Sequence, residues 1–185
     1  MDNIFFDIKT LKYVGRNVII GKTVRIRYPQ LVSIGDNCII DDFTYISTPL
    51  ELKKYVHIGS GAKIIGGKNS LIYMDEFSTT APNVVLSAGS DDYIGGIASP
   101  LVPIEFKGNI EIGKILIGKH CIIGAGSVVL PNVTFNEGAS LGALSLAKED
   151  LEPWILYAGV PCRKIKERNK KQILELEKLF KERYE

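Results

Sequence analysis

The side chains best suited to chemistry in this chain are two histidines and one short polar cluster. His57 and His120 are its only imidazoles, and an imidazole titrates close enough to neutrality to take a proton from a reacting group. The cluster combines a hydroxyl, two carboxylates and a phenol: Ser90, Asp91, Asp92 and Tyr93. Carboxylates suit an amine substrate, because they hold its ammonium form and accept a hydrogen bond as it loses a proton.

The polar cluster lies in a segment that lacks the regularity of its surroundings. Between Leu86 and Ile117 a six-residue spacing of apolar residues lapses over residues 87–116. An excursion this long within a regular array is either functional or disordered. Pro100 and Pro103 stiffen the segment, which favours function. It serves as a site loop, as a rigid arm that clasps a neighbouring subunit, or as both.

The elements that must position these residues follow from that six-residue spacing. One apolar residue recurs at every sixth position, in two long runs: Ile34, Ile40, Ile46, Leu52, Ile58 and Ile64, then Ile117, Ile123, Val129, Phe135 and Leu141. A helix would need a period of 3.6 and an ordinary strand a period of 2. A period of six suits short straight segments joined by turns, with one large side chain pointing inward from each.

Four hexapeptides carry a recognisable family pattern, in which an aliphatic residue and glycine are followed by a small residue at the fifth place. They are IGDNCI, IGSGAK, IGKHCI and IGAGSV. In this the chain resembles the hexapeptide-repeat acyltransferases. The resemblance implies an all-β fold, a left-handed parallel β-helix with three hexapeptides per coil, assembled as a homotrimer.

The spacing also divides the chain into three parts. Residues 1–19 show no six-residue step and are expected to cap the first coil. Residues 20–152 form the β-helix domain, with the extended loop 87–116, and local irregularities are expected at Tyr28-Pro29 and at Gly66-Gly67-Lys68-Asn69. Residues 153–185 form an extended segment and then a C-terminal α-helix, expected from Arg163 to Glu185.

The C-terminal half, from IIGAGSVV to CRKIKER, narrows the resemblance to the xenobiotic, galactoside and maltose acetyltransferase branch and to sugar acetyltransferases of surface-polysaccharide pathways. This resemblance implies acetyl-CoA as co-substrate. It places small residues along the pantetheine arm and two cations at the CoA phosphates: Gly124, Ala125, Ala143 and Ser145, then Lys148 and Arg163. Each has the alternative of being an ordinary turn or surface residue.

This chain departs from the branch at the catalytic position. The family's loop histidine falls near Asp91 or Asp92, and neither is histidine. Counting coils places His57 near the corner of Asp91, so His57 and Asp92 are the candidate catalytic residues, with Ser90, Asp91 and Tyr93 binding substrate. The alternative for His57 is a structural imidazole. His120 is expected to be a solvated or subunit-contact residue.

The missing histidine favours an amine acceptor, because an alcohol needs a positioned base more than an amine does. We therefore expect N-acetylation of a nucleotide-linked amino sugar in surface-polysaccharide biosynthesis. O-acetylation of a sugar hydroxyl is the alternative, and a non-catalytic β-helix scaffold is the second. A zinc enzyme of the carbonic-anhydrase type would need three histidines, so no metal is expected.

The bulk composition excludes several other classes of function. A formal charge of +2 gives no support for a nucleic-acid or membrane-surface partner. No apolar run approaches a membrane span, and an N-terminus with Asp2 and Asp7 does not look like a signal peptide, so a cytoplasmic protein is expected. Cys38 and Cys121 occupy the small fifth place of their repeats and are expected in the core, with no disulfide framework.

Overall fold

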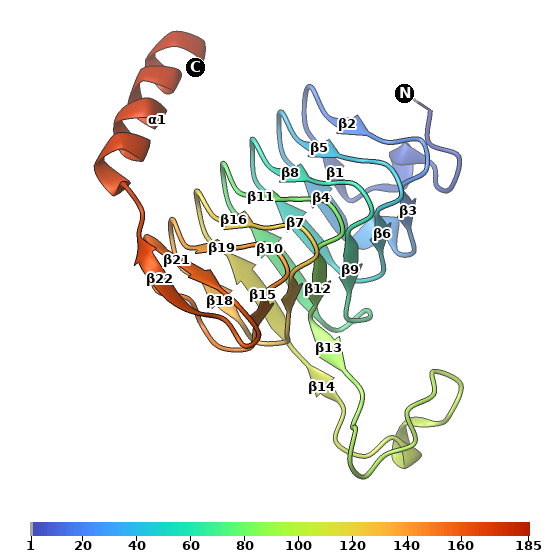
Figure 1. Ribbon diagram of the computed structural model, residues 1–185. Helices are drawn as coiled ribbons and strands as arrows, with labels where there is room; N and C mark the ends of the chain where they lie inside the picture. Colours follow the sequence, from blue (N-terminus) through green and yellow to red (C-terminus); the bar gives the residue numbers. More distant parts are fainter. Residues whose placement is uncertain (1) are drawn as a thin grey trace.

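The computed structural model describes residues 2–185, and most of them form a stack of triangular coils. Each coil contributes one short strand to each of three parallel sheets (Figure 1). The first sheet, sheet A, contains β1 (Tyr13–Val14), β4 (Val32–Ile34), β7 (Leu50–Leu52), β10 (Leu71–Met74), β15 (Lys114–Ile117) and β18 (Thr134–Phe135).

The other two sheets complete the triangle. Sheet B contains β2 (Ile19–Ile20), β5 (Ile39–Ile40), β8 (His57–Ile58), β11 (Thr79–Thr80), β16 (Ile122–Ile123), β19 (Ser140–Leu141), β21 (Ile155–Ala158) and β22 (Arg163–Glu167). Sheet C contains β3 (Arg25–Ile26), β6 (Tyr45–Ile46), β9 (Lys63–Ile65), β12 (Val85–Ser87), β17 (Val128–Val129) and β20 (Leu146–Ala147). The all-β fold expected from the sequence, a left-handed parallel β-helix with a C-terminal helix and one long excursion loop, is confirmed.

The core consists of the residues that the six-residue spacing selects. Ile34, Ile40, Ile46, Ile58 and Ile64 all have no exposed surface. Full burial of one such side chain contributes roughly 1.5–3 kcal/mol before conformational entropy is counted. The two cysteines that share the fifth place of their repeats, Cys38 and Cys121, are also buried, as expected.

The irregular segments also fall where the sequence places them. Pro29–Leu31 forms the 3-10 helix η2 at the first interruption, and Gly66 and Gly67 form a turn with positive φ at the second. The N-terminal part differs, because the first coil begins at Tyr13, inside the expected cap. Within residues 2–12 the one regular element is η1 (Ile8–Thr10), while Phe6 and Leu11 pack against the core.

The C-terminal helix also begins later than expected. Residues 163–167 form β22, which pairs antiparallel with β21, because β21 ends sheet B and offers an unpaired edge. The helix α1 then covers Lys170–Tyr184, with the Asn169 side chain accepting from the backbone N–H of Gln172. It runs back along the line of corners between sheets A and B (Figure 1).

α1 is held on these corners by an aromatic stack. Tyr55, Phe77 and His120 occupy equivalent positive-φ positions in successive coils. The Tyr55 and Phe77 rings stack at 5.0 Å, and Phe77 and His120 at 5.4 Å. Phe180 of α1 meets the first two rings edge-on, at 5.2 and 5.8 Å. Such aromatic pairs contribute roughly 0.5–1.5 kcal/mol beyond burial.

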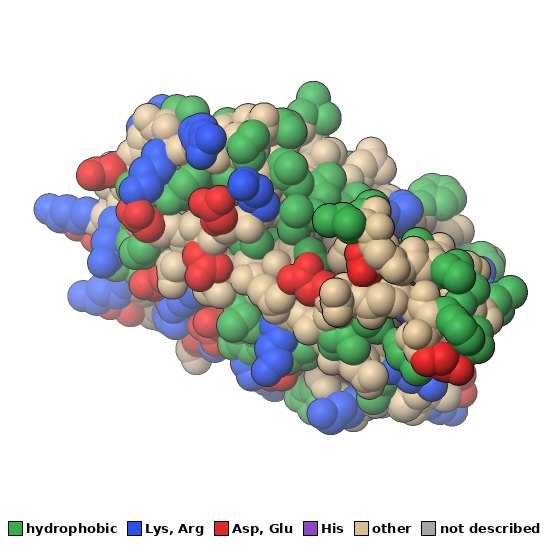
Figure 2. Space-filling view, turned by 90° about the horizontal axis from the view of Figure 1, so that it is seen from below, with side chains coloured by type: hydrophobic (Ala, Val, Ile, Leu, Met, Phe, Trp, Pro, Cys, Tyr) green, Lys and Arg blue, Asp and Glu red, His purple; other side chains and the backbone are tan. Residues whose placement is uncertain are grey.

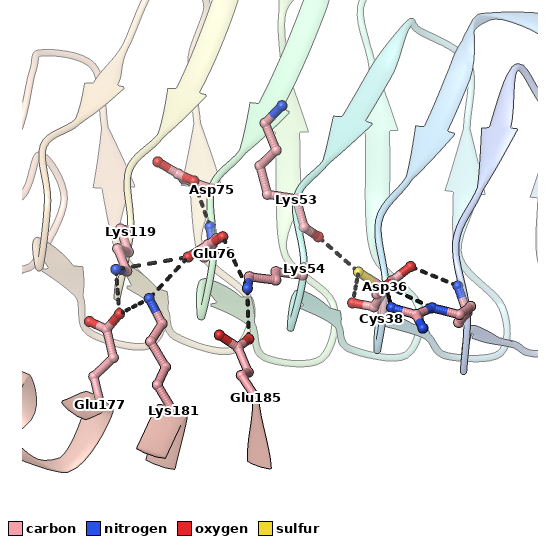
Figure 3. A network of polar contacts seen from close by, with 11 residues as sticks. Asp36, Cys38, Lys53, Lys54, Asp75, Glu76, Lys119, Glu177, Lys181 and Glu185 are labelled. Atoms are coloured by element: carbon pink, nitrogen blue, oxygen red, sulfur yellow. Dashed lines mark hydrogen bonds and ion pairs between the residues drawn. The ribbon is translucent and has the colours of Figure 1, made fainter. Parts of the chain in front are cut away.

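A network of ion pairs also joins α1 to the turns of the β-helix (Figure 3). Glu177 lies 2.7 Å from His120 Nε2 and 2.7 Å from Lys181 Nζ, and it also contacts Lys119. His120 is 7% exposed, so it is neither the solvated nor the subunit-contact residue expected from the sequence; α1 covers it. Burial alone would raise the pKa of Glu177, but hydrogen bonds from Lys119, Lys181 and His120 outweigh it and lower the pKa to about 2.

Glu177→Gln should therefore lower the free energy of unfolding by about 1–3 kcal/mol, because it leaves the buried His120 and two partly exposed lysines without their charged acceptor. The sign of the pH effect follows from the lowered pKa. The contribution of Glu177 is complete above its ordinary pKa of 4.5 and is lost as the pH falls toward 2. Denaturant titrations of wild type and variant should therefore converge on acidification.

The matched control for this prediction is Glu175→Gln on the exposed side of the same helix. Glu175 makes a 4.0 Å pair with Lys171, and both side chains are more than half exposed. Its loss should change the free energy of unfolding by less than about 0.5 kcal/mol. Equal effects of the two substitutions would contradict the role given to Glu177.

Candidate functional site

The site is built on a row of side chains at the carboxyl ends of the sheet C strands. The sheet C strands are in parallel register. The outward-facing residue at the end of each strand therefore lies directly beside its equivalent in the next coil. The row, from the first coil to the last, is Arg27, Ser47, Ile65, Ser87, Leu130 and Lys148. Neighbouring members lie about one strand spacing apart, roughly 4.8 Å.

An arm leaves the β-helix beside the middle of this row, after β12. Its stem is a two-stranded antiparallel ribbon of β13 (Gly89–Ser90) and β14 (Glu111–Ile112), and it also contains η3 (Ile104–Phe106). The arm projects below the coils in the green part of the chain (Figure 1). Gly89 has no room for a side chain, since a Cβ there would lie 2.9 Å from the Gly66 carbonyl oxygen and 3.2 Å from that of Glu111.

Asp92 folds the arm on itself. Its carboxylate accepts hydrogen bonds from the backbone N–H groups of Ile94 at 2.8 Å, Gly95 at 3.0 Å and Asn109 at 2.9 Å. These bonds join the two ends of the arm. The hydrogen bond from Asn109, followed by those from Ile94 and Gly95, lowers the pKa of Asp92. The expected catalytic carboxylate is thus engaged in loop structure.

Two cavities lie on either side of the arm stem. The upstream cavity, about 520 Å³, is lined by Ser47, Gly66, Gly67, Lys68, Asn69, Pro100, Lys107, Ile110 and Ile112. The downstream cavity, about 650 Å³, is lined by Ser87, Tyr93, Leu130, Pro131 and Lys148. Both are also lined by Ile65, Gly89, Ser90, Asp91 and Glu111, so they meet at the stem.

Two carboxylates, Asp91 and Glu111, lie at the meeting point of the cavities. Within residues 2–185 the Asp91 side chain has no hydrogen-bond or ion-pair partner, while Glu111 accepts a 2.8 Å bond from Asn132. Three residues expected to bind substrate, Ser90, Asp91 and Tyr93, share the downstream cavity with Lys148. Asp92 lines neither cavity, so the geometry favours Asp91 over Asp92 as the group facing a substrate.

His57 does not lie at the corner of Asp91. It sits in β8 on the outside of sheet B, where its Nε2 is 2.8 Å from Asp41 and its Nδ1 is 3.3 Å from the Thr79 hydroxyl. Counting coils gave the wrong position for His57 because Asp91 is not part of a coil. It follows β13, the first strand of the arm stem, which leaves the β-helix after a sheet C strand. Within one chain, His57 lines neither cavity.

The residues expected to contact the cofactor lie in two places, the corner between sheets B and C and the strand β22. Gly124, Ala125 and Ala143 lie on the corner between sheets B and C, where a Cβ at Gly124 would come within 2.4 Å of the Ala143 nitrogen. The wall there is bare backbone and small side chains. Arg163 is exposed in β22, next to Ala158.

Ser145 has a different role from the one expected. It is 2% exposed, and its hydroxyl donates to the Ala143 carbonyl at 3.2 Å and accepts from the Gly159 N–H at 2.9 Å. Its own N–H donates to the Ser127 hydroxyl at 3.1 Å. Because these groups are already paired inside the coil, Ser145 is not available to a cofactor.

The polar lining of the upstream cavity was not predicted from the sequence. Lys68 lies in the turn that was noted only as an irregularity, and Lys107 lies late in the arm. A basic residue within a glycine turn is a signal that could have identified the first. Among residues 2–185 there is no group of three or more His, Cys, Asp and Glu side chains arranged to hold a metal ion. No helix in that range is long and apolar enough to cross a bilayer.

Comparison with known proteins identifies the class. No family model matches, but the chain is 39% identical over 186 residues to the dTDP-4-amino-4,6-dideoxy-D-glucose acyltransferase of Escherichia coli, covering 98% of this chain and 94% of that protein. The chain belongs to the hexapeptide-repeat acyltransferases.

A solved structure extends this relationship to three dimensions. AntD, an N-acyltransferase from Bacillus cereus in complex with dTDP and 3-hydroxybutyryl-CoA, is 38% identical, covers 98% of both chains and superposes with a TM-score of 0.88. The galactoside O-acetyltransferase of Escherichia coli K12 is more distant, at 29% identity over 80% of this chain and 78% of that protein.

The arm geometry predicts different outcomes for the two neighbouring aspartates. Asp92→Ala removes the acceptor of three backbone N–H groups, so amides 94, 95 and 109 should exchange with solvent at least tenfold faster. Asp91→Ala, the matched control, should leave their exchange unchanged because Asp91 bonds no backbone group in the arm. Hydrogen-exchange mass spectrometry measures both. Unchanged protection in Asp92→Ala would contradict the structural role.

Proposed function

We propose that the protein transfers an acetyl group from acetyl-CoA to the amine of a nucleotide-linked amino sugar. The observation that carries the proposal is the unpaired Asp91 carboxylate at the point where the two cavities meet. The relatives support it, since one acts on a dTDP-linked amino sugar and a structure of an AntD variant contains dTDP-4-amino-4,6-dideoxyglucose and coenzyme A.

In this reaction Asp91 orients the acceptor. An ammonium group attracted to the carboxylate gives one proton to solvent, and the free amine, still hydrogen-bonded to Asp91, attacks the thioester carbonyl carbon. A C–N bond forms and the C–S bond breaks, and the second amine proton passes to the departing thiolate, so that the products are the amide and CoA with a free thiol. Orientation of the two reactants supplies much of the acceleration, since an amine needs less base assistance than an alcohol.

The downstream side of the stem suits the acyl donor. Leu130 and Pro131 provide apolar surface near the acyl group. Lys148 is next to Leu130 in the row and pairs with Glu149 at 3.3 Å, so we place it beside the acyl end of CoA and not at the phosphates expected from the sequence. Along the bare wall of Gly124, Ala125 and Ala143, the N–H groups of Ala125 and Ala143 donate to no acceptor within residues 2–185, and they are the groups proposed to bond the pantetheine amides. Arg163, exposed in β22, remains a proposed phosphate contact.

O-acetylation is the second candidate, favoured by the similarity to a galactoside O-acetyltransferase. A hydroxyl acceptor needs a base, and within one chain no imidazole lines either cavity. His57 with Asp41 would meet that need only if a neighbouring subunit brought it to the stem. The third candidate, a β-helix scaffold without catalysis, does not explain why the two cavities meet at Asp91, whose carboxylate is unpaired within residues 2–185.

A homotrimer is part of the proposal. The arm exposes many large apolar side chains, including Tyr93 at 92%, Ile94 at 100% and Leu101 at 95%. Figure 2 shows the molecule from below, the side toward which the arm projects, with hydrophobic side chains exposed at several places among polar ones. Apolar patches of this kind mark subunit contacts. Light scattering should give the mass of three chains, and the mass of one or two would refute the trimer.

Two further expectations go with this reaction. A cytoplasmic location suits an enzyme that uses acetyl-CoA, and surface-polysaccharide biosynthesis suits one that modifies an activated sugar. The direct test is mass spectrometry of products from acetyl-CoA with dTDP-4-amino-4,6-dideoxyglucose, and with galactoside as the hydroxyl acceptor. An N-acetylated nucleotide sugar is expected; acetylation of the galactoside alone would favour the second candidate.

Substitution of the two candidate catalytic groups should give unequal losses. Asp91→Asn should lower kcat/KM for the amino sugar by roughly 10²-fold or more, because it removes the charge that positions the amine, while the Kd for CoA stays unchanged. His57→Asn should stay within about tenfold if the acceptor is an amine. Full activity in Asp91→Asn together with a dead His57→Asn would show that the imidazole is the base.

A further inference from the structure

The upstream cavity has features that an amine acceptor alone does not require. It is lined by the turn Gly66-Gly67-Lys68-Asn69 of the β-helix and by Lys107 of the arm. The two lysines line this cavity and not the downstream one. The carboxylates Asp91 and Glu111 lie where the cavities meet, so the cavity is acidic at the stem and basic beyond it.

The turn presents backbone donors. The Gly66 carbonyl accepts from the Ser70 hydroxyl at 2.7 Å, and the Gly67 carbonyl accepts from the Thr48 hydroxyl at 2.8 Å. In contrast, within residues 2–185 the N–H groups of Gly67, Lys68 and Asn69 donate to no protein acceptor. Gly66 and Gly67 both have positive φ, and successive free N–H groups in such a turn bind anions.

The two lysines are uncompensated. Across the described chain, residues 2–185, neither Lys68 nor Lys107 has a carboxylate within 4.0 Å. Lys68 Nζ lies instead 4.9 Å above the ring of Tyr28, which also meets the guanidinium of Arg27 at 5.6 Å. Cation–π contact keeps the Lys68 ammonium at the cavity rim without neutralising it.

We infer that the upstream cavity binds the diphosphate of a nucleoside diphosphate-linked acceptor. Lys68, Lys107 and the N–H groups of the turn take the phosphate oxygens, and the sugar amine reaches Asp91 at the stem. This inference rests on the proposed function and assigns the two halves of the substrate. A cavity of about 520 Å³ is within the range of small-ligand sites.

CoA also carries a diphosphate, and the experiment must separate the two sources. Calorimetric titration of the whole protein with dTDP and with CoA does so. Lys68→Ala and Lys107→Ala should each raise the Kd for dTDP about tenfold or more, because each removes a charged phosphate contact. The Kd for CoA should not change.

The matched control is Lys63→Ala. Lys63 is an exposed lysine of β9 on the same sheet, its ammonium donates to the Gly61 carbonyl, and it lines neither cavity. It should leave the Kd for dTDP unchanged. With 4-amino-4,6-dideoxyglucose lacking the nucleotide, wild type, Lys68→Ala and Lys107→Ala should show the same kcat/KM.

The outcomes separate the inference from the proposed function. If the wild type acetylates dTDP-4-amino-4,6-dideoxyglucose but both lysine variants bind dTDP like wild type, the cavity assignment is wrong and the function stands. Weaker CoA binding with unchanged dTDP binding would assign the cavity to the cofactor and overturn the inference. A wild type that neither binds dTDP nor acetylates the nucleotide sugar refutes both.

Discussion

The structure depends on one repeated constraint, the burial of a single aliphatic side chain in each hexapeptide. Ile58 and Ile64 in one coil, and Ile123 and Val129 in a later one, have no exposed surface. Because each buried side chain fixes the phase of its strand, its outward neighbours are fixed as well. The parallel register then aligns those neighbours into rows, and the site is one such row with an arm beside it.

The arm interrupts the sequence without interrupting this register. β10 pairs with β15 and β12 with β17, although the arm lies between them in the chain. The coil below the arm therefore stacks on the coil above it as if the insertion were absent. This arrangement places the base of the arm beside the sheet C row, and the stem lies between two cavities that share Asp91.

The sequence predicted the parts of the molecule that repeat. The core, the irregular turns and the buried cysteines follow from spacing alone, and the burial of Ser145 was open to inference, because it holds the small fifth place that points inward. The parts that do not repeat were harder. Nothing in the adjacent pair Asp91 and Asp92 says which carboxylate the arm will use, since the N–H groups of Ile94, Gly95 and Asn109 meet only after folding.

Long-range pairing explains the remaining differences. Residues 163–167 have a composition compatible with a helix but form a strand, because β21 leaves a free edge beside them. His120 is a turn residue by sequence, and its burial depends on a helix more than fifty positions away. The position of His57 relative to Asp91 was predicted by counting coils. Such a count relates His57 to a residue of the arm only when the strand after which the arm leaves is known.

The central claim is that the arm stem separates the acceptor from the acyl donor, with Asp91 between them. A crystal structure of the protein with coenzyme A and dTDP-4-amino-4,6-dideoxyglucose tests this most directly. The account predicts the sugar amine within hydrogen-bond distance of the Asp91 carboxylate, the dTDP phosphates beside Lys68 and Lys107, and the CoA thiol on the Lys148 side. Phosphates of dTDP bound beside Lys148, or an amine remote from Asp91, would contradict it.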